Sequence, residues 1–296
     1  MLGVVAGRVL AVVAAMLLVA SGVIVGRDRL ARTRREYRRR LASVVPYLGL
    51  LAVVLLANKL ARDVGPGVSW LIGLNVTPLV HRLDGLLLWP VYPESTPQFV
   101  VWLQSHGSPR LTTYFSFVYV FGYVFLLTFP LVAYVALPDA RPLRRTVVAY
   151  AANYIVGVGC YVIFIAYGPR NLIAGDVEGL LFTQYTQYQF LTASVNHQTN
   201  VFPSLHTSLS VTAALLAWTT REEYPQWPPI AAVLAVSVAI STMYLGIHWA
   251  TDVVFGAVLG WASVRIGRRF EETPPDVRGF GARLRSRLEA LPPHVR

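Results

Sequence analysis

Long apolar stretches separated by short polar segments run through almost the whole sequence. An α-helix needs about 20 predominantly apolar residues to cross a hydrocarbon layer of ~30 Å, and several of these stretches approach or exceed that length. The pattern therefore predicts an all-α integral membrane protein with about seven transmembrane helices. The predicted spans are residues 2–25, 41–60, 111–137, 146–167, 203–220, 230–244 and 248–266.

The connection between the second and third spans, residues 62–110, has a different pattern. Its apolar parts are interrupted by charged residues, histidine and proline. These parts are residues 70–89 and 99–105. A mixture of aromatic and charged residues is typical of the membrane headgroup zone, so we expect interfacial or re-entrant helices, with a further full span as the alternative. His81, Arg82 and Asp84 are either substrate contacts or ordinary polar residues of such a helix.

Three arginine clusters follow the first, third and seventh predicted spans. Because arginine-rich loops stay in the cytoplasm, all three clusters are expected on the cytoplasmic side and the N-terminus outside. The first span is expected to be an uncleaved anchor, since a secretory signal carries its positive charges before its apolar core. The clusters are Arg27, Arg29, Arg32, Arg34, Arg35, Arg38, Arg39 and Arg40; Arg141, Arg144 and Arg145; and Arg265, Arg268 and Arg269.

The composition argues against a soluble or nucleic-acid-binding protein. Charged residues make up 14% of the chain and hydrophobic residues 55%, whereas soluble domains contain about 25% charged residues. The net charge of +11 comes mainly from arginines beside the apolar spans, where they set topology and attract anionic membrane lipids. Cys160 is the only cysteine, which excludes an intrachain disulfide and a cysteine zinc cluster.

A first candidate for chemistry is the segment Phe202-Pro203-Ser204-Leu205-His206. Proline is favoured in the first turn of a helix. The N–H groups that follow lack intrahelical acceptors and lie at the positive end of the helix dipole, so they can bind a phosphate oxygen. Ser204 adds a hydroxyl group, and His206 can donate or accept a proton. The alternative is a capped helix start with an incidental histidine.

A second candidate lies between Ser241 and Asp252, where Gly246 permits a sharp turn between two spans. His248 and Asp252 are four residues apart and are expected to share one helix face. The carboxylate can accept the Nδ1–H of His248 and leave Nε2 free as a nucleophile. An ionisable residue one turn inside a span is costly, which makes Asp252 a functional candidate. The alternative is a structural pair that joins two helices.

Together, the two motifs resemble those of the type 2 phosphatidic acid phosphatase superfamily, which includes the vanadium haloperoxidases. That family carries P-S-G-H followed by S-R-x5-H-x3-D, and here Leu205 replaces the glycine and Thr242 the arginine. The resemblance covers about residues 110–268. The family's K-x6-R-P motif is absent, because Arg170 stands at its place but Ile163 occupies the lysine position.

The P-S-L-H and S-T-x-Y-L-G-x-H forms are more similar to the branch of fungal inositol phosphorylceramide synthases and related prokaryotic proteins. Members of that branch transfer a phospho-headgroup between lipids. The resemblance implies that His248 forms a phosphohistidine, that Asp252 orients it, and that His206 protonates the leaving group and then activates water or an acceptor hydroxyl. It also implies a substrate-binding set that consists of Arg170, Ser204, Thr242 and His197.

Thr242 can offer only a neutral hydrogen bond where the family has an arginine, and charged bidentate contacts are the stronger ones. Arg170 or His197 would then supply the missing positive charge. The alternative for Arg170 is an arginine that merely reaches toward the membrane surface.

The sequence therefore predicts a six-helix phosphatase-type transmembrane core with an extra N-terminal span. We divide the chain into an anchor span with a basic cytoplasmic loop, a second span with outer interfacial helices, a catalytic core, and a polar cytoplasmic tail. These parts are residues 1–40, 41–110, 111–268 and 269–296.

The expected function is that of a lipid phosphatase or phosphotransferase, acting on a lipid phosphate or phosphodiester at the extracytoplasmic side of the plasma membrane. We expect no metal, no cofactor and no nucleic-acid partner. Headgroup transfer is the alternative within the same mechanism. A transporter with a histidine proton relay and a catalytically silent lipid-binding protein are the alternatives of other classes. The sequence leaves the donor, the acceptor and the oligomeric state open.

Overall fold

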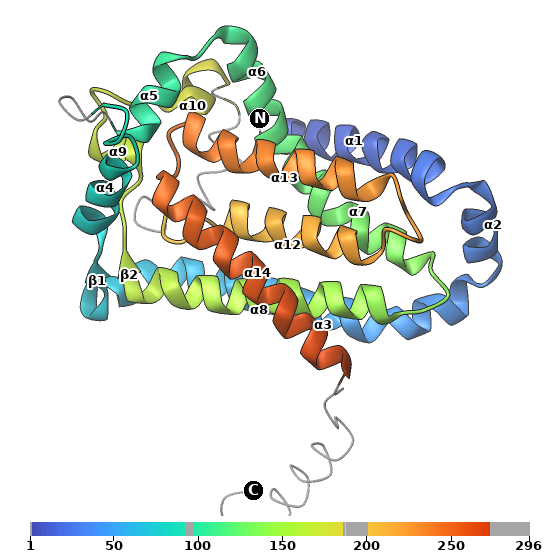
Figure 1. Ribbon diagram of the computed structural model, residues 1–296. Helices are drawn as coiled ribbons and strands as arrows, with labels where there is room; N and C mark the ends of the chain where they lie inside the picture. The colour runs from blue at the N-terminus through green and yellow to red at the C-terminus, as the bar shows by residue number, and fades with distance from the viewer. Residues whose placement is uncertain (1, 93–97, 186, 188–200, 273–296) are drawn as a thin grey trace, which may run out of the picture.

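The computed structural model describes residues 2–92, 98–185, 187 and 201–272, and nearly all of its regular structure is helical (Figure 1). The elements are α1 (Leu2–Ala20), the π-helical turn η1 (Ser21–Val25), α2 (Arg27–Arg35), α3 (Tyr37–Ile72), β1 (Leu74–Asn75), α4 (Thr77–Leu86), α5 (Phe99–Ser105), α6 (Pro109–Phe117), the π-helical turn η2 (Val118–Gly122), α7 (Tyr123–Val135), α8 (Arg141–Ile163), β2 (Phe164–Ile165), α9 (Pro169–Leu172), α10 (Leu180–Gln184), α12 (Leu205–Thr219), α13 (Trp227–Tyr244) and α14 (Ala250–Glu272).

Six helical segments of the described residues are long and apolar enough to cross a membrane, which confirms the predicted all-α membrane class. They are Gly3–Val25, Val44–Gly65, Pro109–Val135, Arg141–Ile163, Trp227–Tyr244 and Ala250–Phe270. The remaining predicted span forms α12, which has only 15 residues. At a rise of 1.5 Å per residue, α12 is about 22 Å long.

The short helix α12 lies inside the bundle and packs against α7, α8, α13 and α14 (Figure 1). Several side chains on its buried face are polar, and Asn153 of α8 forms hydrogen bonds with two of them. The Asn153 amide donates to Thr212 Oγ1 at 2.8 Å, and the Ser208 hydroxyl donates to Asn153 Oδ1. Buried polar groups need such partners. Because protein surrounds α12, this helix requires neither the length nor the apolar surface of a lipid-facing span.

Two glycines of α14 let it approach α12 closely. A Cβ atom on Gly256 would lie 2.5 Å from the Ser204 carbonyl oxygen, and one on Gly260 would lie 2.5 Å from that of Ser208. Glycines four residues apart lie on the same helix face and permit this kind of backbone contact in membrane proteins. The spacing therefore brings the starts of α12 and α14 side by side.

The three arginine clusters lie at the end of the bundle where α2 meets the core. Arg29 of α2 forms an ion pair with Glu223, with Nη2 and Oε2 2.7 Å apart. Arg40 of α3 donates to the carbonyl oxygen of Leu137 at 2.8 Å, just before α8 begins. The end of α14 packs on the start of α8, where Gly267 faces the Arg145 backbone. Figure 1 shows α4, α5, α9 and α10 at the opposite end.

The segment between the second and third spans forms two short helices at that opposite end. α3 is longer than the predicted span and continues to Ile72, after which β1 pairs in parallel with β2, so that Leu74 lies opposite Phe164. The short helices α4 and α5 have 10 and 7 residues. Neither is long enough to cross a bilayer, and their lengths agree with the expected interfacial helices. Residues 273–296 of the predicted tail lie outside the described residues.

We predict that Gly260→Ala lowers the stability of the protein. The added methyl group would push against the Ser208 carbonyl, and overpacking of this kind costs about 1–3 kcal/mol. The melting temperature of the detergent-solubilised variant measures the effect. Gly159→Ala in α8 is the matched control, because a Cβ atom there meets nothing within 4 Å. Equal melting temperatures for the two variants would contradict close packing of α12 on α14.

Candidate active site

His248 lies in the tight turn that joins α13 to α14. The amides of Ile247 and His248 both donate to the Thr242 carbonyl oxygen at 3.0 Å. Gly246 has a φ of 73°, and a Cβ atom there would lie 2.7 Å from the Glu178 carbonyl oxygen. Only glycine suits a position with both this conformation and this contact. The predicted role of Gly246 as a turn residue is therefore explained, and the turn sets the position of the imidazole.

Asp252 follows as the third residue of α14 and caps the start of its own helix. Its Oδ2 atom accepts the Trp249 amide at 2.8 Å, the arrangement of a capping box. The same oxygen lies 3.5 Å from Nδ1 of His248. The helix thus begins at Ala250, and not at His248 as the sequence analysis placed it. His248 and Asp252 still meet, because the capping bond turns the carboxylate back toward the preceding turn.

The imidazole of His248 is buried, with only 4% of its side chain exposed. Burial, and after it the positive charge of Arg170, lower the pKa of His248 to about 3, while a backbone hydrogen bond with Val201 acts in the opposite direction. The imidazole of His248 is therefore neutral at physiological pH. Such a ring retains a lone pair on one nitrogen and can act as a nucleophile or a base.

His206, the second residue of α12, points toward His248. Their ring centroids are 6.3 Å apart. On its other sides His206 packs against Tyr119 and Tyr123, with ring centroids 4.7 and 4.6 Å away. The structure therefore brings together the two histidines that the motifs singled out. The two tyrosines were missed by the sequence analysis, because nothing in their local pattern separates them from other aromatic residues of a span.

The predicted phosphate ligand Ser204 is the N-cap of α12 and is completely buried. Its Oγ accepts the Thr207 amide at 3.3 Å and pairs with Thr207 Oγ1 at 3.0 Å. The Ser204 amide donates to the Asp252 carbonyl oxygen at 3.0 Å and so ties the two motifs together. Pro203 precedes the cap, which corrects its predicted place in the first turn of the helix. The serine hydroxyl is engaged in capping.

Arg170 lies in the short helix α9, where its amide donates to the Gly246 carbonyl oxygen at 3.2 Å. Its guanidinium carbon lies 4.6 Å from the centroid of the Phe182 ring. Atom Nη1 is buried and has no hydrogen-bond partner among the described residues. Burial lowers the pKa of Arg170, against the opposing effect of Tyr119. A buried guanidinium nitrogen with unused hydrogen-bonding capacity, close enough to affect His248, is suited to an anionic group.

The other two members of the predicted substrate-binding set are Thr242 and His197. The Thr242 hydroxyl donates to the Ala239 carbonyl oxygen at 2.8 Å, within its own helix. Its remaining contribution to a ligand is a lone pair, which does not attract an anion. His197 lies outside the described residues. Within the described ranges, no group of three or more histidine, cysteine, aspartate or glutamate side chains is placed to hold a metal ion.

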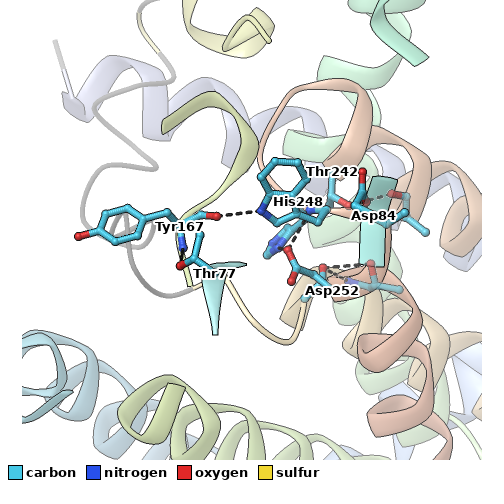
Figure 2. A network of polar contacts seen from close by, with 11 residues as sticks. Thr77, Asp84, Tyr167, Thr242, His248 and Asp252 are labelled. Carbon is cyan, nitrogen blue, oxygen red and sulfur yellow. Dashed lines mark hydrogen bonds and ion pairs between the residues drawn. The ribbon is translucent and has the colours of Figure 1, made fainter. Parts of the chain in front are cut away.

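Asp84 of α4, for which the sequence left a substrate contact and an ordinary interfacial residue as alternatives, belongs to the same neighbourhood (Figure 2). The carboxylate is completely buried; Oδ1 accepts the Ala250 amide at 2.7 Å, and Oδ2 accepts the Phe99 amide at 3.1 Å. Burial raises the pKa of Asp84 to about 6, while the hydrogen bonds from Ala250 and Phe99 act in the opposite direction. The only sequence signal was an acidic residue within an otherwise apolar segment.

Trp249 connects the start of α14 to the segment that follows β2. Its indole N–H donates to the Tyr167 carbonyl oxygen at 2.8 Å, and the Tyr167 amide donates to Thr77 Oγ1 at 3.1 Å (Figure 2). The His81 ring meets the Trp249 indole edge-on, with centroids 5.4 Å apart. The turn that carries His248 is thus held from α4, from the segment after α8 and from α14.

Three comparisons with known proteins show what the chain is similar to. An uncharacterized protein of Methanocaldococcus jannaschii, MJ0662, is 25% identical over 212 residues, which cover 64% of this chain and 81% of that protein. The crystal structure of Aquifex aeolicus LpxE matches with a TM-score of 0.46 and 16% identity, covering 57% of this chain and 92% of that one. Residues 178–274, the range that holds His206, His248 and Asp252, match the family model of the PAP2 superfamily.

Proposed function

We propose that the protein is a membrane enzyme that removes or transfers the phosphoryl group of a lipid phosphate or phosphodiester through a phosphohistidine on His248. The observation that carries the proposal is the pair of imidazoles with centroids 6.3 Å apart, which lets one phosphoryl group between them contact both rings. Asp252 stands behind one ring, and the buried guanidinium of Arg170 lies nearby. The match to the PAP2 superfamily over residues 178–274, which include both histidines and Asp252, supports the assignment.

In the first half of the proposed reaction, Nε2 of His248 attacks phosphorus and the bond from phosphorus to the leaving oxygen breaks. His206 gives its proton to that oxygen. Asp252 accepts Nδ1–H of His248, holds the tautomer and stabilises the positive charge that develops on the ring. The present separation of 3.5 Å between Nδ1 and Oδ2 must shorten for this bond, as catalytic hydrogen bonds often do when substrate binds.

In the second half, His206 takes a proton from water or from an acceptor hydroxyl. The oxygen so activated attacks phosphorus, the phosphorus–nitrogen bond breaks, and His248 returns to its neutral state. Water as the acceptor gives hydrolysis, and a lipid or polyol hydroxyl gives headgroup transfer of the inositol phosphorylceramide synthase type. Both outcomes use the same residues, so the acceptor is set by what reaches His206.

Arg170 is the proposed main ligand of the phosphate oxygens. It offers a buried, unused donor, and fixed positive groups stabilise the charge of a transferring phosphoryl group. The hydroxyl hydrogen of Thr242 is used within its helix, so this residue does not replace an arginine. The first amides of α12 lie beside His206 and add donors at a helix N-terminus. His197 remains a proposed second cation.

An apolar groove supports a lipid substrate. The groove has a volume of about 540 Å³ and runs between α4, α8 and α14. Pro203 and Thr251 form part of its wall, each next in sequence to a residue of the proposed site. A hydrocarbon chain in this groove would place its headgroup close to the histidines. With the arginine clusters at the opposite end of the bundle, the positive-inside rule puts this site on the extracytoplasmic side, proposed to be that of the plasma membrane.

We predict that His248→Ala lowers turnover by more than about 10⁴-fold, the scale expected when a nucleophile is lost, and that His206→Ala lowers it by about 10²–10⁴-fold. Mass spectrometry of products from mixed phospholipids and polyprenyl phosphates measures both phosphate release and headgroup transfer in detergent. The matched control is His106→Ala, because His106 is exposed and bonds only within its own segment.

The same assay separates the competing classes of function. A transporter shows no chemistry without a closed membrane, and a silent lipid-binding protein shows none with any substrate. Near-normal turnover by His248→Ala would refute the proposed nucleophile. An acid-labile phosphoenzyme in the wild type that is missing in His248→Ala would support it.

A second prediction concerns Arg170→Gln. Loss of a charged contact should lower kcat/KM by about 10–100-fold. It should also raise the pKa of His248, because Arg170 lowers that pKa. Protonated His248 has no lone pair, so activity is lost as pH falls through its pKa, and the acid limb of the kcat/KM profile should move to higher pH. Arg110→Gln, which changes an exposed arginine of α6, is the control. An unchanged profile and rate in Arg170→Gln would exclude the proposed role.

The proposed orientation in the membrane is tested with single cysteines in a Cys160→Ser background. Ser105→Cys lies at the site end and Glu222→Cys at the arginine end, and both positions are exposed. A membrane-impermeant maleimide applied to intact cells should label the cysteine at position 105 and leave that at position 222 unlabelled until the cells are opened. The reverse pattern would place the site in the cytoplasm.

A further inference from the structure

Two backbone N–H groups at the start of α14 donate hydrogen bonds to two different carboxylates. The N–H groups at the start of a helix have no intrahelical acceptor. Asp252 takes the Trp249 amide from within the same turn, and Asp84 takes the Ala250 amide from 166 residues away in sequence. Two successive amides directly after His248 are therefore held by two acidic side chains, one local and one distant.

Asp84 is itself held rigidly. Its side chain is completely buried, and its second oxygen accepts the Phe99 amide at the start of α5. The α4 helix that carries it begins beside the parallel pair of β1 and β2, and Thr77 in its first turn accepts the Tyr167 amide. One carboxylate therefore bridges α4, α5 and α14 from a firmly placed helix (Figure 2).

We propose that Asp84 is a positioning residue, which fixes the start of α14 through the Ala250 amide so that Asp252 faces His248 in the geometry of reaction. The proposal rests on the proposed function, because it assigns Asp84 to the same site. Under this proposal α4 contributes a residue to the active site, although α4 lies outside the residues matched by the family model.

Asp84 and Asp252 are alternative hydrogen-bond acceptors for the Ala250 amide. Without Asp84, the Ala250 amide would be a buried donor without an acceptor, which costs free energy. Asp252 at the start of the same helix uses Oδ2 to accept the Trp249 amide, but its buried Oδ1 has no hydrogen-bond partner among the described residues and could accept the Ala250 amide instead. A shift of Asp252 toward Ala250 would draw it away from Nδ1 of His248, from which it now lies 3.5 Å. By satisfying Ala250, Asp84 leaves Asp252 available to the imidazole.

The experiment compares Asp84→Asn with the wild type at pH 8, where the Asp84 carboxylate is ionised because its pKa is about 6. An amide places an N–H donor against one of the two backbone N–H groups and breaks the bridge. We expect kcat and the rate of phosphohistidine formation to fall by about 10–100-fold, since small misplacements of reacting groups have effects of this size. KM should stay within about threefold, because substrate binding is not touched.

The matched control is Ser69→Ala, which removes a buried hydrogen bond from α3 to the Tyr161 carbonyl oxygen without touching α4 or Ala250. It should lower the melting temperature but leave kcat within about threefold of the wild type. If Asp84→Asn is not recovered folded, Asp84→Glu replaces it, since one added methylene displaces the carboxylate and should lower kcat in the same way.

Wild-type kcat in the Asp84 variant, or an equal loss of kcat in Ser69→Ala, would overturn the proposal. Failure of the proposed function would give a different result, namely normal turnover in His248→Ala. An inactive His248→Ala together with a fully active Asp84 variant would remove only the role of Asp84.

Discussion

The amides at the start of α14 need hydrogen-bond acceptors, and the two carboxylates that accept them connect α4, α12 and α14 at the candidate site. Asp252 accepts from Trp249, Asp84 accepts from Ala250, and the Asp252 carbonyl in turn accepts from Ser204 of α12. Unpaired backbone groups are costly away from water, so this end of the helix has little freedom. The position of His248 follows from those bonds and from the Gly246 turn before it.

The rest of the bundle keeps the two histidine-bearing segments together. α12 carries His206, and Asn153 of α8 forms hydrogen bonds with two of its buried polar side chains, Ser208 and Thr212. Gly256 and Gly260 bring α14 against the backbone of α12, so the distance between the two histidines is set by the packing of these two helices.

The two ends of the molecule have different characters. The three arginine clusters lie at one end, and there Arg29 and Arg40 connect the N-terminal helices to the core. The other end is built from short helices and backbone hydrogen bonds around a buried histidine, two buried carboxylates and a buried guanidinium. In the proposed function, the arginine of the family motif is missing at Thr242, and Arg170 supplies positive charge from a separate helix. The same chemistry is then reached with a different set of phosphate ligands.

The sequence by itself determined the membrane class, the places of six of the seven predicted spans, the grouping of the arginines, and the two histidines, His206 and His248, that the structure brings together. These depend on local signals, namely apolar length, charge beside each span, and residues at fixed spacing in two short motifs. The tertiary structure alone decided that α12 is short and enclosed, that Ser204 caps a helix, that Tyr119 and Tyr123 flank His206, and that Asp84 reaches Ala250. Contacts of this kind join residues far apart in the chain, and no pattern along the sequence encodes which buried donor a distant carboxylate will meet.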